Sequence, residues 1–388
     1  MPQNKFKILV INYEYPPIGG GGGVICRDIA EEMVALGHEV DIVTSIYKGL
    51  SAHEKVNGVD VHRVPVLFRG AQNVASLPSM LSYIPLGILK ASELNAKRKY
   101  DVINTHFAIP SGPAGNYISK KFKIPNVLSI HGGDIYDPSK SLSPHKTPVL
   151  KNVVRKMLIN ADEVIAQSSD TKRNAISFYG VNREIKIIPL GIKPTQYPIK
   201  SRKELGLAED KFIFSTIGRL IRRKNLEALF EIIKGVNLSF PAQLLIMGDG
   251  PERENLERKI HELNIEQSVK FLGRVSEEEK FQYLDLSDVY LSTAMHEGFG
   301  MVFLEAIKCG LPVICYDKGG QIDFLKDGQT GFFILLDNKN LFIEKLNHLL
   351  ANKQEISKIG NHNKKYVEKF FIKNIAQQYY RVFENLIR

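Results

Sequence analysis

The stretch KILVINYEYPPIGGGGGVICRDIAEEMVALGHEVDIVT, residues 7–44, decides the fold class. Lys7–Asn12 is a short apolar run of the length of a buried strand. Five glycines follow, and Val24–Leu36 then repeats apolar residues at helical spacing. A second apolar run, Glu39–Thr44, predicts the next strand. Strand, helix and strand in this order predict a parallel sheet covered by helices.

The same alternation continues to the end of the chain and falls into two series. Further strands are predicted at Val59–Val66, Asp101–Phe107, Asn126–Ile130, Glu163–Ala166, Phe212–Gly218, Gln243–Met247, Val269–Leu272, Asp288–Ser292 and Val313–Tyr316. Between the series, a linker is predicted by the helix breakers Pro189, Gly191, Pro194 and Pro198. The 388 residues also suit two domains. We therefore predict an α/β protein with two doubly wound, Rossmann-like domains facing a cleft, over residues 1–192 and 193–370. Residues 371–388 are predicted to form an amphipathic helix that packs back on the first domain.

The composition excludes several classes of protein. Apolar residues make up 44% and charged residues 24%, which is typical of globular proteins and excludes disordered and fibrous chains. The uncharged segment Gly70–Leu89 contains two prolines and is a poor membrane span. We expect no leader peptide, because the apolar run after Lys7 has only four residues. The three cysteines are too few and too oddly spaced for a disulfide framework or a zinc site, so a reducing cytoplasm is the expected location.

The positive charge is concentrated in the first half of the chain. The net charge is +10, and residues 1–195 hold 24 basic and 16 acidic groups, against 28 and 26 in residues 196–388. Between residues 61 and 133, nine bases accompany only two acids, Glu93 and Asp101. Nucleic acid, anionic lipid head groups and phosphorylated acceptors are candidate partners of such a face. An ordinary solvated surface is equally consistent with it.

Two turns that join a strand to a helix are candidate phosphate sites. Gly19–Gly23 would let a ligand approach the backbone and the free N–H groups of a helix N-terminus, although such a turn is often only structural. In the second series, Arg219 and Lys224 follow the first strand and could clamp a diphosphate. A solvated basic loop explains the second turn equally well, because Arg222 and Arg223 lie there too.

The segment HEGFG, residues 296–300, offers the sharpest set of functional groups. Glu297 is predicted in the loop after a strand and Glu305 on the next helix. If the span were wholly helical, the two carboxylates would lie about 12 Å apart, too far for a glycosidase pair. They would suit the two ends of one long ligand, with the N–H groups of Gly298 and Gly300 between them. Gly300 also excludes a His-Glu-x-x-His zinc motif. Taken alone, either glutamate would more often be a structural residue.

Several motifs together resemble the retaining, nucleotide-sugar-dependent glycosyltransferases of group 1 (family four), which have the GT-B fold. The resemblance covers nearly the whole chain. Its most specific part is HEGFGMVFLEAIKCGLPVI at 296–314. The other motifs are YPPIGGGGGV at 15–24, LGHEV at 36–40, HGGD at 131–134, GRLIRRKN at 218–225, MGDGP at 247–251, FLGRV at 271–275 and the glycine pattern at 319–331.

The resemblance implies a role for each matching position. Arg219 and Lys224 would bind the donor diphosphate, Glu297 would hold hydroxyls of the donor sugar, and Glu305 would accept hydrogen bonds from the ribose. The N–H groups of Gly298, Phe299 and Gly300 would cradle the sugar and phosphate. Backbone around Arg274 would contact the base, and Gly20 would close over the phosphate from the first domain.

His131 would lie at the reacting carbon. Its position agrees, because it follows the apolar strand Val127–Ile130 and ligands of open α/β sheets bind beyond the carboxyl ends of strands. A lone histidine is more often a packing or surface residue, and the chain has ten. One departure from the family pattern is the linker, which reads Pro189-Leu190-Gly191-Ile192-Lys193 in place of Pro-Asn-Gly-x-Asp. A polar contact made there is expected to be missing or replaced.

We expect a retaining, metal-independent hexosyltransferase that uses a nucleotide-diphosphate sugar and has no cofactor. No Asp-x-Asp pair is present in the sequence, so protein cations are expected to stabilise the leaving diphosphate. By resemblance, the departing phosphate oxygen takes the acceptor's proton and the acceptor attacks from the same face. Two alternatives stay open. A GT-B nucleotide-sugar 2-epimerase would convert donor without acceptor, and a basic nucleic-acid-binding protein would shift DNA or RNA at low salt.

The acceptor is expected to be a glycan or a lipid-linked molecule, in cell-surface polysaccharide or glycolipid synthesis. The segment Gly70–Leu89 carries Leu77, Met80, Leu81, Tyr83, Ile84 and Leu86 and is followed by Lys90 and Lys97–Lys99. Apolar residues beside clustered bases suit a surface that lies on an anionic membrane, so peripheral attachment to its cytoplasmic face is expected. An ordinary core helix with a solvated end would have the same composition.

Overall fold

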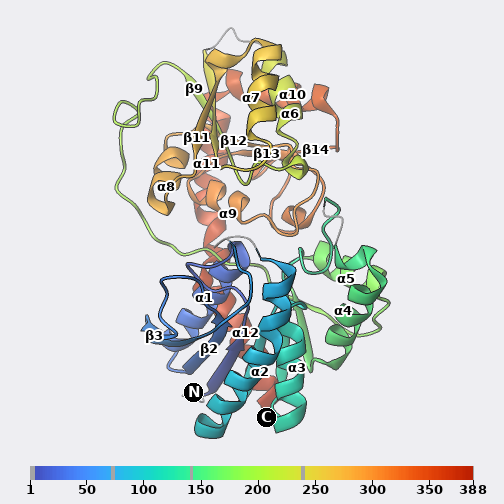
Figure 1. Cartoon of the computed structure of the whole chain (residues 1–388). Coiled ribbons are helices and arrows are strands. Elements are labelled where there is room, and N and C mark those ends of the chain that lie inside the picture. The colour runs from blue at the N-terminus through green and yellow to red at the C-terminus, as the bar shows by residue number, and fades with distance from the viewer. Residues whose placement is uncertain (1–4, 71–74, 140–142, 237–240, 388) are drawn as a thin grey trace. The chain divides into compact units, whose positions relative to one another are not determined.

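The computed structural model describes residues 5–70, 75–139, 143–236 and 241–387, and it divides into two compact units (Figure 1). The N-terminal unit comprises Met1–Lys193 together with Phe370–Arg388, and the C-terminal unit comprises Pro194–Lys369. The boundaries predicted from the sequence lie after residues 192 and 370. The chain therefore leaves the first unit and later returns to it.

The N-terminal unit is built on an eight-stranded sheet with the order β3-β4-β2-β1-β5-β6-β7-β8. All neighbouring strands are parallel except β3 and β4, and the order reverses between β1 and β5, as in a doubly wound fold. The strands are β1 (Lys7–Ile11), β2 (Glu39–Ser45), β3 (His53–Val56), β4 (Val59–Val64), β5 (Val102–His106), β6 (Asn126–Ile130), β7 (Glu163–Ala166) and β8 (Lys186–Ile187).

The strand β3 was not predicted, and its sequence explains why. It alternates exposed and half-buried side chains with little apolar content, because it forms the edge of the sheet. It pairs with β4 through Asn57 and Gly58, whose φ angles of 48° and 86° suit a two-residue hairpin turn. The Asn-Gly pair was the available signal. The short strand β8 was also missed.

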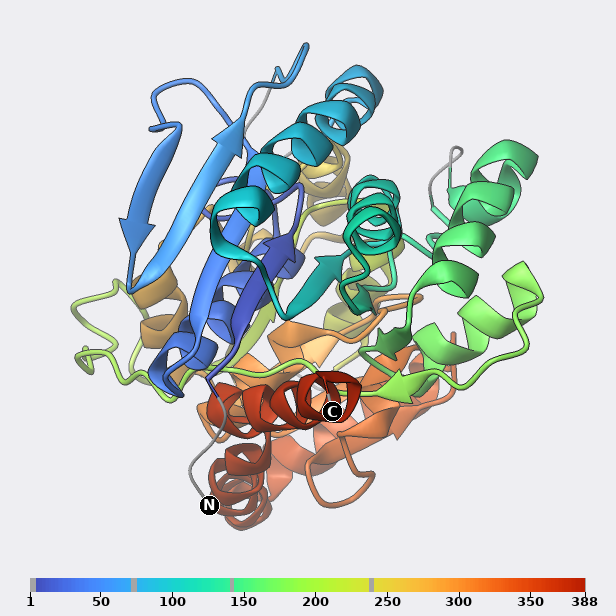
Figure 2. The ribbon, with the colours of Figure 1, turned by 90° about the horizontal axis from the view of Figure 1, so that it is seen from below.

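Six helices cover this sheet: α1 (Gly21–Ala35), α2 (Leu77–Arg98), α3 (Ser111–Phe122), α4 (Pro148–Asn160), α5 (Ser169–Tyr179) and α12 (Ile372–Ile387). The helix α1 begins at Gly21 and not at Val24, so three of the five glycines form its first turn. The terminal helix α12 belongs to this unit, as predicted, and packs against α1 (Figure 2). The ring of Tyr380 on α12 stacks on Phe6, with centroids 5.8 Å apart.

The C-terminal unit contains a six-stranded, wholly parallel sheet with the order β11-β10-β9-β12-β13-β14. Its strands are β9 (Phe212–Ile217), β10 (Ala242–Met247), β11 (Val269–Gly273), β12 (Val289–Ser292), β13 (Val313–Tyr316) and β14 (Gly331–Ile334), the last of which was not predicted. Its α-helices are α6 (Leu226–Gly235), α7 (Arg253–Leu263), α8 (Glu277–Asp285), α9 (Met301–Lys308), α10 (Lys339–Ala351) and α11 (Lys353–Tyr366). Short 3₁₀ turns lie at Pro144–Lys146, Arg222–Lys224, Glu266–Ser268, Gly320–Asp323 and Val367–Phe370.

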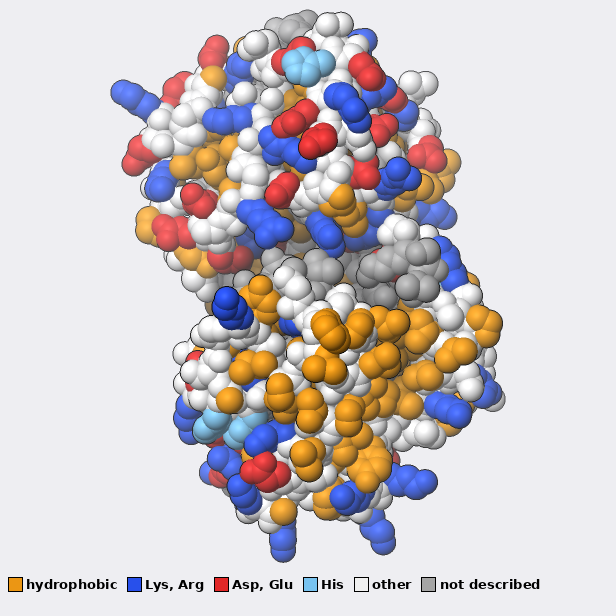
Figure 3. All heavy atoms as spheres, viewed as in Figure 1, with side chains coloured by type: hydrophobic (Ala, Val, Ile, Leu, Met, Phe, Trp, Pro, Cys, Tyr) orange, Lys and Arg blue, Asp and Glu red, His pale blue; other side chains and the backbone are white. Residues whose placement is uncertain are grey.

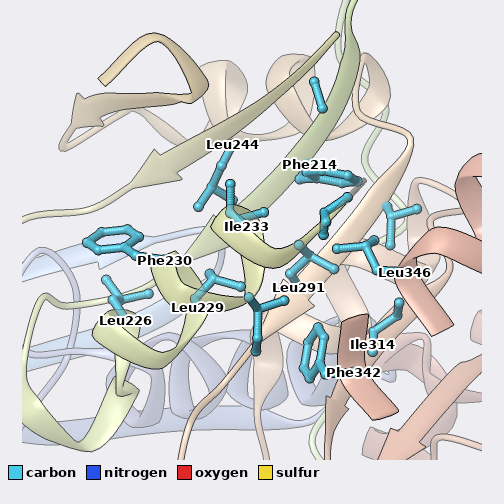
Figure 4. Packing of buried hydrophobic residues seen from close by; sticks show 14 of the residues in the cluster. Phe214, Leu226, Leu229, Phe230, Ile233, Leu244, Leu291, Ile314, Phe342 and Leu346 are labelled. Atoms are coloured by element: carbon cyan, nitrogen blue, oxygen red, sulfur yellow. The ribbon is translucent and has the colours of Figure 1, made fainter. Parts of the chain in front are cut away.

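The core of this unit joins the sheet to helices α6 and α10 (Figure 4). Phe214 and Leu244 of the sheet meet Leu229 and Phe230 of α6, and all four are almost fully buried. Each such side chain contributes about 1.5–3 kcal/mol of burial energy, so this core stabilises the sheet from which the loops project. Within the described ranges, no helix is both long enough and apolar enough to span a bilayer.

Candidate functional site

The carboxyl ends of β9 and β12 mark the point where the strand order of the C-terminal unit reverses. The strands β10 and β11 follow β9 on one side, whereas β12, β13 and β14 extend on the other. Ligands of doubly wound sheets bind in the crevice at this point. The loop after β9 carries the predicted residues Arg219 and Lys224, and the loop after β12 carries Glu297, so both motifs lie at this point of the sheet.

The loop after β9 is fixed by the loop after β10. The N–H groups of Gly218 and Leu220 donate hydrogen bonds to the carbonyl oxygens of Met247 and Asp249, at 3.0 and 3.1 Å. A Cβ atom on Gly248 would lie 1.9 Å from the carbonyl oxygen of Gly218, so only glycine permits this approach. The glycines of the MGDGP motif therefore hold the neighbouring loop in place.

Lys224 projects from the 3₁₀ turn Arg222–Lys224 toward the start of that loop. A Cβ on Gly218 would lie 2.7 Å from Lys224 Cε, so this glycine leaves room for the lysine side chain. A small pocket beside it is lined by Thr216, Ile217, Gly218, Arg219, Leu220, Lys224, Leu226, Ile246 and Ser292. Arg219 is exposed and has no ion-pair partner within the described ranges, which leaves its guanidinium available to an anion.

Glu297 forms a compact ionic cluster with two cations of the β9 loop. Its Oε1 lies 2.6 Å from Lys224 Nζ and its Oε2 lies 3.1 Å from Arg223 Nη1. All three side chains are at least four-fifths buried. Burial raises the pKa of the Glu297 carboxyl, but Lys224 and then Arg223 outweigh it and hold the pKa at about 2. The carboxylate is therefore ionised at neutral pH and orients both cations.

The backbone of Glu297 is held as firmly as its side chain. Its carbonyl oxygen accepts a hydrogen bond of 2.7 Å from the N–H of Gly320, and it forms a bridge with Gly319. A Cβ on Gly319 would lie 2.2 Å from that carbonyl oxygen, and the φ of Gly319 is +120°. Arg223 contributes twice, because its guanidinium also donates to the carbonyl oxygen of His296.

Gly298, Phe299 and Gly300 link Glu297 to helix α9. Phe299 is buried and stacks on Phe324 with ring centroids 4.7 Å apart, so its side chain anchors the loop. Gly300 precedes the first residue of α9 at a φ of +90°, and a Cβ there would collide with the Phe303 ring. This packing leaves only the backbone of the three residues to contact a ligand.

Glu305 and Arg274, the remaining predicted residues of this unit, lie apart from the ionic cluster. Glu305 on α9 accepts a hydrogen bond of 2.7 Å from Lys280 Nζ on α8. Burial lowers the pKa of Lys280, but Glu305 and Glu277 raise it further, so the lysine remains a cation. Arg274 follows β11 directly and is exposed.

His131 of the N-terminal unit ends a chain of hydrogen bonds that begins in the sheet. Asn104 Nδ2 donates to the carbonyl oxygen of Val127 at 3.2 Å, so Asn104 Oδ1 faces His106 and accepts from its Nε2–H at 2.9 Å. Burial keeps the pKa of His106 well below 6.5, and its Nδ1 is then an acceptor. His131 Nε2 lies 2.9 Å from that Nδ1 and must be the donor.

His131 is therefore held as a neutral ring with its proton on Nε2. Burial lowers its pKa to about 4, against the opposing effect of the Gln167 side chain. Its Nδ1 makes no hydrogen bond of good geometry among the described residues. The backbone N–H of His131 donates to Asp134 Oδ1 at 2.9 Å, so the HGGD motif also fixes the main chain.

The glycine run lies beside the ring of Phe107, which packs on His131 with centroids 4.6 Å apart. A Cβ on Gly22 would lie 2.3 Å from that ring, which explains glycine at this position. The N–H of Gly20, which the sequence analysis reserved for a phosphate, donates to Glu14 Oε2 at 3.2 Å. An anion would have to displace or share that exposed carboxylate.

Lys193 replaces the family's linker aspartate and has acquired partners of its own. Its Nζ lies 2.6 Å from Glu31 Oε2 and 3.0 Å from Asp28 Oδ1, both on α1. Lys193 thus makes polar contacts of its own within the N-terminal unit.

Four residues with evident roles were not singled out from the sequence. They are Asn104 and His106, which orient His131, Arg223, which shares Glu297, and Lys280, which pairs with Glu305. Arg223 was visible only as one base among three. Asn104 and His106 lie two residues apart on β5, a spacing that places both side chains on one face and was the available signal for their contact. The other pairs join different elements, and no spacing rule connects them. Within the described ranges, no group of three or more His, Cys, Asp or Glu residues could hold a metal ion.

Comparisons with known proteins account for nearly the whole chain. The family model for glycosyl transferases group 1 matches residues 199–366, and the model for glycosyltransferase family 4 matches residues 19–196. An uncharacterized glycosyltransferase of Methanocaldococcus jannaschii is 29% identical over 97% of this chain and 98% of its own. The alpha-monoglucosyldiacylglycerol synthase of Acholeplasma laidlawii is 26% identical over 92% and 91%.

Two solved structures share the fold. The sucrose-phosphate synthase of Thermosynechococcus elongatus superposes with a TM-score of 0.86 at 23% identity, over 98% of this chain and 99% of the other. The Anabaena protein HepE, in complex with UDP-glucose, superposes with a TM-score of 0.77 at 21% identity, over 98% and 100%. The two family models, matched one to each half, and these neighbours agree with the motifs and with both sheets. The chain belongs to the group 1 glycosyltransferases and has the GT-B fold.

Proposed function

We propose that this glycosyltransferase is a retaining, metal-independent hexosyltransferase. It moves the sugar of a nucleoside-diphosphate donor to a glycan or lipid-linked acceptor, in the synthesis of a cell-surface polysaccharide or glycolipid. The observation that carries the proposal is the cluster of Lys224, Arg223 and Glu297 at the strand reversal of the C-terminal unit.

The cluster supplies what cleavage of a sugar–phosphate bond requires. As the bond between the anomeric carbon and the phosphate oxygen breaks, negative charge gathers on the diphosphate. Lys224 is already oriented by Glu297, and exposed Arg219 stands beside the same pocket, so both can stabilise that charge with little rearrangement. Protein cations then do the work that a chelated metal does in other transferases.

The charge state of His131 suits the transition state of a glycosyl transfer. Positive charge develops on the sugar ring in the transition state, and a neutral imidazole does not oppose it. The departing phosphate oxygen takes the proton of the acceptor hydroxyl, and the new bond forms on the face that the diphosphate leaves. Glu305 and the backbone near Arg274 are proposed to contact the ribose and the base.

The comparisons support the donor and acceptor classes only by analogy. HepE was solved with UDP-glucose, and the Acholeplasma laidlawii relative is named as a glucosyldiacylglycerol synthase. A uridine donor carrying glucose and a diacylglycerol-type acceptor are therefore the first pair to test.

The test is a donor panel in which released nucleoside diphosphate is measured with and without acceptor, and with and without EDTA. We expect release that depends on acceptor, persists in excess chelator and gives a product of unchanged anomeric configuration by NMR. Inverted configuration would contradict the retaining assignment, and strong, reversible loss with EDTA would contradict the metal-free one. Conversion of donor without acceptor would favour the epimerase.

A further inference from the structure

An exposed apolar strip on the N-terminal unit has no partner within the described part of the chain. Helix α2 exposes Leu77, Leu81, Pro85 and Leu89, which are spaced four residues apart and therefore lie on one side of the helix. The three leucines are 55%, 59% and 67% exposed. At 1.5 Å per residue this strip extends about 18 Å along the helix.

The loop before α2 extends the strip with Leu67 and Phe68, which is 80% exposed. This loop is held against the helix, because Leu67 N–H donates to Ser82 Oγ at 2.9 Å and Ser76 Oγ donates to the carbonyl oxygen of Phe68 at 2.7 Å. We call Leu67, Phe68, Leu77, Leu81 and Leu89 the apolar face. Figure 3 shows hydrophobic side chains gathered broadly over this side of the N-terminal unit.

Helix α2 is apolar on the side that packs against the core as well as on its exposed side. The exposed side of such a helix is normally polar, so its leucines are unusual. Tyr83 is fully buried and donates a hydrogen bond to the carbonyl oxygen of Val43, and Met80 and Leu86 pack on the same core. A membrane surface was expected to include these three residues together with Leu77 and Leu81. For the three, that expectation is wrong and the alternative, a core helix, is right. A helix that is hydrophobic all round is normally covered on all sides, so the apolar face requires a cover.

Unpaired lysines lie at the ends of α2 and α3. Both helices follow parallel strands and pack on one another, so their C-terminal ends lie at the same edge of the sheet. Lys99, Lys120 and Lys123 there are exposed and have no acidic partner among the described residues. Lys97, in contrast, pairs with Glu93 at 2.8 Å, and Arg98 pairs with buried Asp41 at 2.8 Å.

We propose that the apolar face docks on an anionic lipid bilayer, with α2 lying in the plane of the interface and the three lysines against the lipid head groups. The proposal deepens the proposed function, since it would bring a lipid-linked acceptor to the enzyme. A second copy of the chain is a poorer occupant. In a two-fold contact with antiparallel helices, the lysines of one copy would meet the first turn of the partner's α2, which holds no acidic residue, whereas an anionic leaflet supplies the opposite charge.

The experiment is vesicle flotation of the intact protein, which requires no enzymatic activity and so stands apart from the test of function. We expect strong binding to vesicles that contain phosphatidylglycerol, weak binding to phosphatidylcholine alone, and loss of binding at high salt. Replacement of Lys99, Lys120 and Lys123 by Gln should reduce partitioning about a hundredfold, since each lysine contributes about fivefold near an anionic leaflet. Arg98 is left intact because it holds Asp41.

The apolar contribution is tested by L77S/L81S/L89S, which should bind neither type of vesicle. L335S is the matched control, because Leu335 is 63% exposed but lies on the C-terminal unit, and it should bind as the wild type does. Unchanged circular dichroism shows that the variants fold. Equal binding to both types of vesicle, or binding to neither, would overturn the proposal. A dimer in light scattering that L77S/L81S/L89S abolishes would assign the face to a second copy instead.

Discussion

Removing one member of the Lys224–Glu297 pair should affect stability and turnover in a way that the structure lets us calculate. The pKa of Glu297 falls from 4.5 to about 2, and at 1.36 kcal/mol per unit this corresponds to about 3 kcal/mol of stabilisation at neutral pH. Burial opposes this shift, so the two cations together contribute more than that, and Lys224, the larger of the two, contributes at least about 2 kcal/mol. The stabilisation is complete above about pH 4.5 and is lost as the pH falls toward 2.

The assay is a double-mutant cycle with K224M, E297Q and the double variant, followed by calorimetry of the transition that contains the C-terminal unit. At pH 7 we expect a coupling energy of about 2 kcal/mol. The matched control is R222Q with E252Q, because Arg222 lies in the same β9 loop as Lys224 and pairs with Glu252 of the loop after β10, but Arg222 is 88% exposed and the pair is 3.4 Å apart. That surface pair should show a coupling close to zero.

Activity separates the roles of the two residues. K224M should lose turnover about a hundredfold and bind the nucleoside diphosphate more weakly, because one preorganised cation is gone. E297Q should lose turnover to a similar extent while retaining affinity for the nucleoside diphosphate, because both cations remain. A coupling energy no larger than that of the control pair would refute the reasoning, as would full activity of K224M with unchanged affinity.

Three further predictions concern the residues that hold the site. N104L removes the acceptor that His106 Nε2–H contacts at 2.9 Å, so the proton of His106 is no longer fixed on Nε2. His131, which donates to His106 Nδ1, should then change from one tautomer to a mixture, visible in the ¹⁵N shifts of labelled histidine. A single unchanged tautomer would contradict the chain of hydrogen bonds. The pKa of His131 is lowered to about 4, so the unfolded chain binds more protons than the folded one between pH 4 and 6.5, and the free energy of unfolding should rise with pH in that window. H131Q should flatten this pH dependence in unfolding curves measured at several pH values. An unaltered slope would contradict the lowered pKa. G319A should destabilise the C-terminal unit by about 1–3 kcal/mol in thermal unfolding and reduce turnover, because the added Cβ would lie 2.2 Å from the carbonyl oxygen of Glu297. Wild-type stability would show that this close backbone contact is not needed.

Much of the fold could be predicted from the sequence because the buried strands are short apolar runs. Asn126–Ile130, Glu163–Ala166 and Val313–Tyr316 have the same bounds in the structure. In a parallel sheet both faces are covered, so such strands contrast sharply with the polar loops around them. The strands that were missed, β3, β8 and β14, lie at sheet edges. The strand β3 has little apolar content and β8 has only two residues, whereas β14 reads Gly-Phe-Phe-Ile and its apolar run was overlooked.

The candidate site could be predicted only in part. Motif position indicated Lys224 and Glu297, but they are 73 residues apart, and their contact depends on β9 and β12 being neighbours. Strand order is a tertiary property that local periodicity does not carry. The same limit applies to Lys97 and Arg98, which look like a free basic cluster in the sequence. In the structure Lys97 pairs with Glu93, and Arg98 pairs with Asp41 and Asp60.

The return of the chain to the N-terminal unit has a consequence for how the protein can be taken apart. Ile192 N–H donates to the carbonyl oxygen of Phe370, and Ile372 N–H donates to that of Ile192, both at 2.9 Å, so the outgoing and returning segments run side by side. Gly191 allows this contact, because a Cβ there would lie 2.9 Å from Ile372 Cα. Topologically, residues 194–369 are an insertion whose two ends leave the host domain from one place. A cut in the linker alone would leave the halves joined. Because the two segments run parallel, excision of the insert would need a splice long enough to turn back from Lys193 to Phe370.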